Sequence, residues 1–143
     1  MIVLDTTVLV YSKGEAHPLR ESCRALIEAI ADGTVEATTI PEVIQEFVHL
    51  RARRRSRRDA AELGRSFADL LSPLLTVGED ELAAGLGLFE RHSALGAFDA
   101  ILAATAMASG ADALASADAT FAHVHGLTHL VPGTPEFDQL RQR

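Results

Sequence analysis

The chain has 143 residues, a length that predicts one domain and leaves no room for a second catalytic domain. Its 48% hydrophobic and 23% charged residues are typical of a soluble globular protein and exclude wholesale disorder and a disulfide scaffold. The net charge of -7 argues against a nucleic-acid partner, but six of the thirteen basic residues lie between Arg51 and Arg58. The charge is therefore segregated, and a polyanionic partner stays possible.

The sequence also predicts a cytoplasmic location. Cys23 is the only cysteine, so no disulfide can form within the chain, and a reducing compartment suits it. The N-terminus reaches Asp5 after a short apolar run, which does not fit a signal peptide. No window reaches the roughly 18 apolar residues of a membrane-spanning helix.

The first half of the chain alternates short strands with helices. An apolar run over 2–4 predicts a strand, and a polar loop follows it. Apolar residues at spacings of three and four then predict a helix over 19–31. A second strand over 35–40 leads directly into a helix over 41–50, which begins at a proline.

The second half continues this alternation. A weaker helical pattern over 59–72 precedes a candidate strand at 74–77. The remaining predicted elements are helices at 80–92 and 98–109, a strand at 112–115, a helical turn at 116–121, a strand at 128–131 and a polar tail over 132–143. Such an order predicts an α/β fold in a single domain, with a mostly parallel central sheet of four to five short strands and helices on both faces.

Three aspartates are candidates for a functional site because of their positions. Binding sites in parallel sheets lie beyond the carboxyl ends of the strands, where Asp5 and Asp118 each follow a predicted strand. Each could instead cap a turn. Asp99 lies in a helix that is apolar nearly all round, where an unpaired charge is costly, although a carboxylate in a first turn also interacts favourably with the helix dipole.

The helix that starts at Pro41 carries two glutamates with different predicted roles. Thr39 and Glu42 have the spacing of a capping box, in which Glu42 bonds back to the backbone of Thr39. On a helical wheel, Glu46 lies about 120° from the centre of the apolar stripe and Glu42 about 160° from it. Glu46 is therefore expected to border the core and to point into the site.

Four carboxylates at one edge of a sheet would repel each other unless a cation neutralised them. Oxygen ligands suit Mg²⁺ or Mn²⁺ rather than Zn²⁺, and acidic clusters of this kind activate water for attack on a phosphodiester. The histidines match no zinc-binding spacing, and His123 and His125 are expected at the surface. No glycine-rich phosphate loop or nucleophile elbow is present. Hydrolysis of nucleic acid is the predicted chemistry.

Four segments, spread over nearly the whole chain, carry these acids: 1–11, 43–47, 96–106 and 116–121. Together they resemble the PIN domain and, more narrowly, the VapC toxins of bacterial toxin–antitoxin pairs. The resemblance implies an Mg²⁺-dependent endoribonuclease that is usually dimeric and is inhibited by a VapB antitoxin.

The resemblance also implies which residues form the site. It assigns catalysis to Asp5, Glu46, Asp99 and Asp118, with the metal held by Asp5, Asp99 and Asp118 and a supporting hydroxyl from Thr7 or Ser116. In the family the last motif often carries a basic residue after its aspartate, where this chain has Ala119.

The arginine segment, residues 51–58, would place like charges four residues apart on a continuing helix. A polyanion or an acidic antitoxin segment would relieve the repulsion, so RNA or partner contacts are expected from Arg51, Arg54, Arg55 and Arg58. The alternative is a solvated basic face. With one tyrosine and no tryptophan, an aromatic stacking platform for bases is not expected.

Two other functions compete with a metal-dependent ribonuclease. One is a catalytically silent α/β module that only binds a partner through its basic helix. The other is phosphoryl transfer through an aspartyl nucleophile at Asp5, which is disfavoured because Thr7 stands where such a motif needs a second aspartate.

Overall fold

The computed structural model describes residues 1–142 of the chain. A four-stranded parallel sheet lies at its centre in the order β2-β1-β3-β4. The strands are β1 (Ile2–Leu4), β2 (Ala37–Thr38), β3 (Ala113–Ala115) and β4 (His129–Leu130). Because all four run in the same direction, their carboxyl ends meet at one edge of the sheet.

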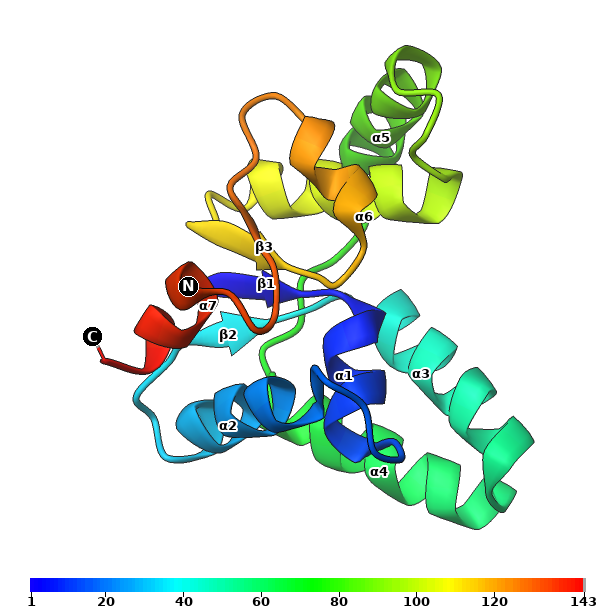
Figure 1. Ribbon diagram of the computed structural model, residues 1–143. Coiled ribbons are helices and arrows are strands. Elements are labelled where there is room, and N and C mark those ends of the chain that lie inside the picture. The colour runs from blue at the N-terminus through cyan, green and yellow to red at the C-terminus, as the bar shows by residue number, and fades with distance from the viewer. Residues whose placement is uncertain (143) are drawn as a thin grey trace.

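Helices cover both faces of the sheet, as predicted for an α/β fold. Figure 1 shows α1, α2 and α4 below the sheet and α5 and α6 above it. The α-helices are α1 (Thr6–Lys13), α2 (Arg20–Ala31), α3 (Pro41–Arg54), α4 (Arg57–Leu70), α5 (Glu79–Arg91), α6 (Ala97–Ala108) and α7 (Pro135–Asp138), with two short 3-10 helices, η1 (Ala119–His123) and η2 (Gln139–Gln142). No helix in residues 1–142 is both long enough and apolar enough to cross a membrane.

The core lies between the sheet and these helices. All residues of β1 and β3 are buried, which is expected for parallel strands that are covered on both faces. Helix α6 buries a run of small and apolar side chains from Leu102 to Ala106. Helix α5 comes very close to α6 at Gly85, where an added Cβ would lie 2.7 Å from Ile101 Cα.

Helix α1 replaces the polar loop that the sequence predicts after the first strand. Its β-branched residues have low helix propensity, and Asp5 at its N-cap makes no capping hydrogen bond through its side chain. The helix is stabilised by tertiary packing instead, because Val8 and Leu9 are buried and α1 packs against α2 and α3.

The strand predicted at 74–77 is wrong, because this segment is a loop. It runs beside the end of β2, where Leu75 N donates to Thr39 O (2.9 Å) and Thr38 Oγ1 donates to Pro73 O (2.9 Å). These bonds hold the segment in place without forming a ladder.

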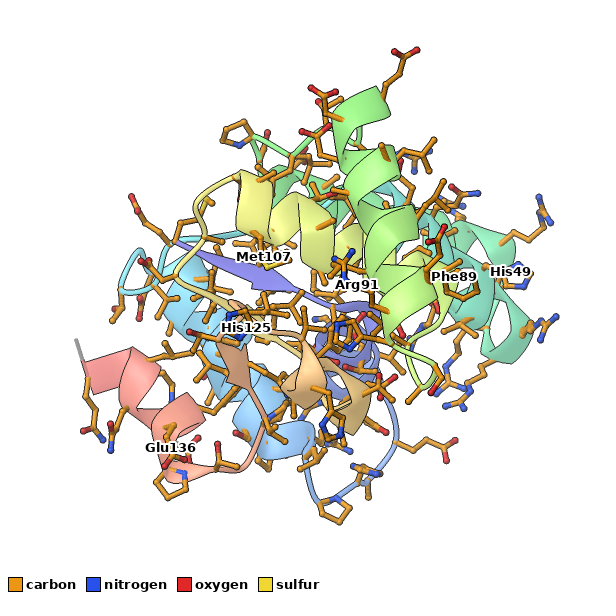
Figure 2. The ribbon with its side chains drawn as sticks, turned by 90° about the horizontal axis from the view of Figure 1, so that it is seen from above. His49, Phe89, Arg91, Met107, His125 and Glu136 are labelled. Carbon is orange, nitrogen blue, oxygen red and sulfur yellow. The ribbon has the colours of Figure 1, made fainter. Side chains whose placement is uncertain are left out.

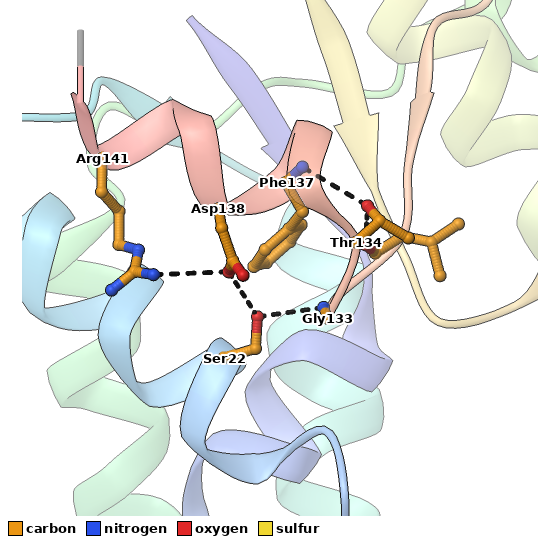
Figure 3. A network of polar contacts seen from close by, with 7 residues as sticks. Ser22, Gly133, Thr134, Phe137, Asp138 and Arg141 are labelled. Atoms are coloured by element: carbon orange, nitrogen blue, oxygen red, sulfur yellow. Dashed lines mark hydrogen bonds and ion pairs between the residues drawn. The ribbon is translucent and has the colours of Figure 1, made fainter.

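The described part of the polar tail expected over 132–143 is folded, since the chain folds back through α7 and η2. Phe137 is fully buried, and one aromatic side chain supplies enough apolar area to dock a short helix. Figure 3 shows the polar contacts beside it, where Asp138 accepts from Ser22 Oγ and pairs with Arg141. Arg143 lies outside the described residues.

Candidate active site

A cavity of about 470 Å³ lies beyond the carboxyl ends of β1 and β3, and all four predicted acids line it. We call it the acidic cavity. Each acid comes from a different part of the fold: Asp5 follows β1, Glu46 lies on α3, Asp99 lies in the first turn of α6, and Asp118 follows β3. The fold therefore brings together carboxylates that are up to 113 positions apart in the sequence.

Asp5 is the most buried of the four acids and is only 4% exposed. Its Oδ2 atom accepts hydrogen bonds from Thr7 Oγ1 (3.0 Å) and Ser116 Oγ (2.6 Å), the two hydroxyls that the sequence singles out. Thr7 Oγ1 in turn accepts from Ala117 N, and Ser116 Oγ accepts from Asp118 N. Both hydroxyls therefore fix the Asp5 carboxylate and tie it to the loop that carries Asp118.

Asp118 and Glu46 are each held by a threonine. Asp118 Oδ1 accepts from Thr120 N (3.0 Å) and Thr120 Oγ1 (2.8 Å), so this residue caps η1 as well as lining the cavity. Glu46 Oε2 accepts from Thr6 Oγ1 (3.0 Å). Sequence reasoning missed Thr6 as a site residue because it predicted a loop where α1 begins.

Asp99 is the exception, because no other residue among 1–142 donates a hydrogen bond to its carboxyl group. Burial is the largest cause that raises the pKa of Asp99 to about 7, and the negative charges of Asp5, Asp118 and Glu46 contribute to the same rise in that order of importance. The three neighbours thus act on Asp99 as one field of negative charge. A cation in the cavity would reverse this effect.

The donor set of the acidic cavity fits a hard divalent cation. The four acids, with Thr6 and Thr7 beside them, supply carboxylate and hydroxyl oxygens, the ligands that Mg²⁺ and Mn²⁺ prefer. Within residues 1–142, no three acidic, histidine or cysteine side chains are already close enough to form a ready metal-binding group. The carboxylates of Asp5, Glu46 and Asp118 are each held by hydrogen bonds from nearby hydroxyl groups. Because their negative charges repel each other, they stay apart in the absence of a cation.

The capping box predicted for Thr39 and Glu42 is wrong. The N-cap of α3 is Ile40, which makes no side-chain capping bond. Thr39 is buried, and its Oγ1 donates to Leu4 O (2.7 Å), so the hydroxyl is committed to the end of β1. Glu42 is exposed on α3 and does not line the acidic cavity.

The arginine segment does not form one helix. Helix α3 ends at Arg54, and Ser56 caps α4 by accepting a hydrogen bond from Asp59 N. The segment therefore bends, and the predicted run of like charges along a continuous helix is wrong. Arg51 is only 17% exposed and pairs with Asp59 (2.7 Å).

The other predicted contact arginines are exposed. Arg58 pairs with Glu62 on the surface of α4. Arg54 lines both the acidic cavity and a neighbouring groove, which Arg55 also lines.

Of the histidines near the C-terminus, His123 and His125 are exposed, as predicted. His129 lies deeper. Its Nε2 atom is 2.9 Å from Ser116 O, directly behind the loop that carries Ser116 and Asp118.

Comparison with known proteins shows the family to which the chain belongs. The PIN domain model matches residues 2–127. The chain is 54% identical over 136 residues to Ribonuclease VapC7 of Mycobacterium tuberculosis, covering 92% of each protein. It is 29% identical over 124 residues to Ribonuclease VapC23 of the same species, covering 85% of this chain and 96% of that protein.

Two solved structures share the fold. VapBC2 from Rickettsia felis, crystallised with a DNA fragment from its promoter, matches with a TM-score of 0.70 at 19% identity over 92% of this chain and 98% of that one. FitAcB from Neisseria gonorrhoeae matches with a TM-score of 0.69 at 18% identity and the same coverage. The chain therefore belongs to the PIN-domain family and, by its similarity to VapC7, to the VapC ribonucleases within it.

Proposed function

We propose that this protein is the toxin of a type II toxin–antitoxin pair, an endoribonuclease that hydrolyses RNA phosphodiester bonds with Mg²⁺ or Mn²⁺. The observation that carries the proposal is the convergence of four carboxylates from four parts of the fold on one cavity. The 54% identity to Ribonuclease VapC7 supports it. We regard residues 1–143 as a single nuclease domain that acts in the cytoplasm, where a lone reduced thiol such as Cys23 persists.

Asp5, Asp99 and Asp118 would hold the divalent cation, and Thr7 and Ser116 would keep Asp5 in place. When bound, the cation would neutralise the carboxylates and the phosphate and would acidify water. Glu46, oriented by Thr6, would accept the proton that the attacking water loses. In the reaction the water oxygen bonds to phosphorus, the bond to the leaving ribose oxygen breaks, and that oxygen takes up a proton.

The proposal predicts metal-dependent cleavage that requires Glu46 but not Glu42. Purified antitoxin-free protein should cut RNA with Mg²⁺ or Mn²⁺ and stop in excess EDTA. Asp5→Asn and Glu46→Gln should each lower kcat at least 100-fold, the range typical of lost acid–base or electrostatic groups, as measured on a labelled RNA.

Glu42→Ala is the matched control, since Glu42 lies one helical turn before Glu46 and outside the acidic cavity. It should keep both activity and melting temperature. Undiminished cleavage in excess EDTA would overturn the metal-dependent mechanism. Loss of activity in Glu42→Ala but not in Glu46→Gln would require the site to be rebuilt around Glu42.

The groove beside the acidic cavity suits an antitoxin segment. It has a volume of about 440 Å³, and its lining combines apolar Val10, Phe47 and Leu50 with Arg54 and Arg55. An acidic amphipathic peptide would match both its apolar floor and its positive charge. We propose this groove as the place where the cognate VapB-type antitoxin binds.

Helix α5 offers a surface for a homodimer. Leu82, Leu86 and Phe89 are 43, 45 and 46% exposed and recur at helical spacing, so they form one apolar stripe. Acidic residues start α5, and Arg91 ends it; Figure 2 labels Phe89 and Arg91 on this helix. Two copies of α5 packed antiparallel about a twofold axis would cover both stripes and place Arg91 of each copy near the acidic turn of the other.

A further inference from the structure

Two aromatic rings stack at the wall of the acidic cavity. Tyr11, on α1, and His17, in the loop before α2, have ring centroids 4.2 Å apart and planes inclined by 21°. Both residues line the same cavity as the four acids. The sequence contains only one tyrosine and no tryptophan, and it therefore gives no sign of an aromatic platform. Only the fold brings the two rings together.

His17 is exposed, yet its ring is held from two sides. One face lies on Tyr11, and Nδ1 accepts a hydrogen bond from Leu19 N (3.1 Å). Because Nδ1 is the acceptor, a neutral ring carries its proton on Nε2, which has no hydrogen-bond partner in the described part of the chain. An exposed histidine normally samples several rotamers, whereas this one is preorganised to bind a flat group.

We propose that His17, supported by Tyr11, stacks on the base of an unpaired nucleotide beside the scissile phosphate. This assignment rests on the proposed ribonuclease function and adds the substrate class to it. Bases in a paired RNA helix are stacked within the duplex, whereas bases in loops and single strands are free to leave the stack and pack on aromatic side chains. In the proposed mechanism a cation held by the neighbouring carboxylates would draw the reacting phosphate into the same cavity, which is large enough for a small ligand.

Tyr11 and His17 have different roles in this platform. His17 contacts the base with its exposed face, and its Nε2–H donates to an acceptor on the base edge or the backbone. Tyr11 is a positioning residue, since it is half-buried and acts on the base through His17. His17 is therefore the specificity-determining residue, and it favours an accessible base over a particular sequence.

The test compares substrates that carry or lack one base. The bond that the wild-type protein cuts is first mapped on a short single-stranded RNA with Mg²⁺ or Mn²⁺. Oligonucleotides with a single abasic residue on either side of that bond are then cut by wild type, His17→Ala, His17→Phe and the control His125→Ala, an exposed histidine that does not line the cavity.

For wild type and His125→Ala, one abasic position should raise KM about 5- to 100-fold with little change in kcat. His17→Phe should behave similarly because it keeps an aromatic face. His17→Ala should show the raised KM on the intact RNA and no further loss on the abasic one. The melting temperature of every variant should stay near that of wild type, because both histidines are exposed.

Three results would overturn the assignment. If wild type had equal KM values for intact RNA and for RNA that is abasic at either position, the protein would not bind a base there. If removal of the base raised KM equally in His17→Ala and in wild type, a group other than His17 would bind the base. If wild type cuts no RNA with any divalent cation, the ribonuclease proposal fails first, and the platform fails with it.

Discussion

Asp99 is the acid of the cavity whose pKa is raised by its surroundings. Its folded-state pKa is about 7, against an ordinary value of 3.8, because burial and three neighbouring carboxylates disfavour its charge. Below about pH 4 both the folded and the unfolded chain carry the proton. Between pH 4 and 7 the unfolded chain loses this proton while the folded chain keeps it, so the free energy of unfolding falls as pH rises. Above pH 7 both forms are ionised and the penalty stays constant.

Asp99→Asn should remove this pH dependence in metal-free protein. Each pH unit within the window costs at most about 1.4 kcal/mol, so the variant should be more stable than wild type by about 1–4 kcal/mol at pH 8 and equally stable near pH 4. Thermal unfolding in EDTA across this range measures the difference. Adding Mg²⁺ should narrow it, because a cation stabilises the ionised carboxylates of wild type. If the difference in stability between wild type and Asp99→Asn were constant from pH 4 to 8, the raised pKa of Asp99 would be contradicted.

The sequence alone could locate the four acids because their positions follow from topology. Asp5 comes directly after β1 and Asp118 three residues after the end of β3, at the edge where parallel sheets form their sites. Glu46 borders the apolar stripe of its helix, and Asp99 interrupts an apolar helix. Thr6 and the pair of Tyr11 and His17 were not predictable in this way. Their contacts depend on α1, which tertiary packing stabilises against its own propensity.

At the scale of elements, the close contact of α5 with α6 depends on one glycine. A Cβ at Gly85 would lie 2.7 Å from both Cα and Cγ1 of Ile101, and a backbone atom cannot move aside cheaply. Gly87, two residues later, differs because an added Cβ would meet only the flexible end of Arg91, at 3.3 Å. The two glycines share one helix and differ in what surrounds them.

Gly85→Ala should therefore lower the free energy of unfolding by about 1–3 kcal/mol, and the melting temperature should fall by several degrees. Gly87→Ala should leave stability unchanged or raise it by up to about 1 kcal/mol, since alanine is the better helix former. Thermal or urea unfolding of both variants measures this. Equal stability of the two would mean that α5 and α6 can separate without cost.

Helices with long apolar patterns were predictable because their burial follows from periodicity. Helices α2, α5 and α6 lie within one or two residues of the ranges expected from the sequence. The break between α3 and α4 was not predictable, because it depends on Ser56 capping α4 and on Arg51 pairing with Asp59. The docking of α7 likewise depends on a single buried aromatic side chain, Phe137.

At the scale of the whole molecule, opposite charge lies on neighbouring surfaces. The acidic cavity repels the phosphates of RNA until a cation is bound, while Arg54 and Arg55 beside it attract them. In the proposed mechanism a cation would therefore serve both substrate binding and chemistry. The same pairing of acid and base recurs on α5, whose first turn is acidic and whose last turn carries Arg91.

The α5 surface leads to a prediction about assembly. In a twofold dimer each contact between the two chains occurs twice. Swapping the charges of two contacting residues in the sequence therefore restores the ion pair at both places. Leu86→Glu should shift the protein to monomers in sedimentation, because it places a charge in the apolar stripe. Leu50→Glu, at an exposed apolar position on α3, should leave the dimer intact.

Arg91→Glu should weaken the dimer by bringing like charges together, and adding Glu79→Arg should restore it at least in part. The sedimentation equilibrium constants of the single and double variants measure this recovery. Because Glu79, Leu86 and Arg91 are all exposed, their replacement should leave the fold and the melting temperature of the monomer unchanged. A wild-type protein that is monomeric at micromolar concentration, or a double variant no stronger than Arg91→Glu, would show that α5 does not pair with itself. The stripe would then be free for a different partner.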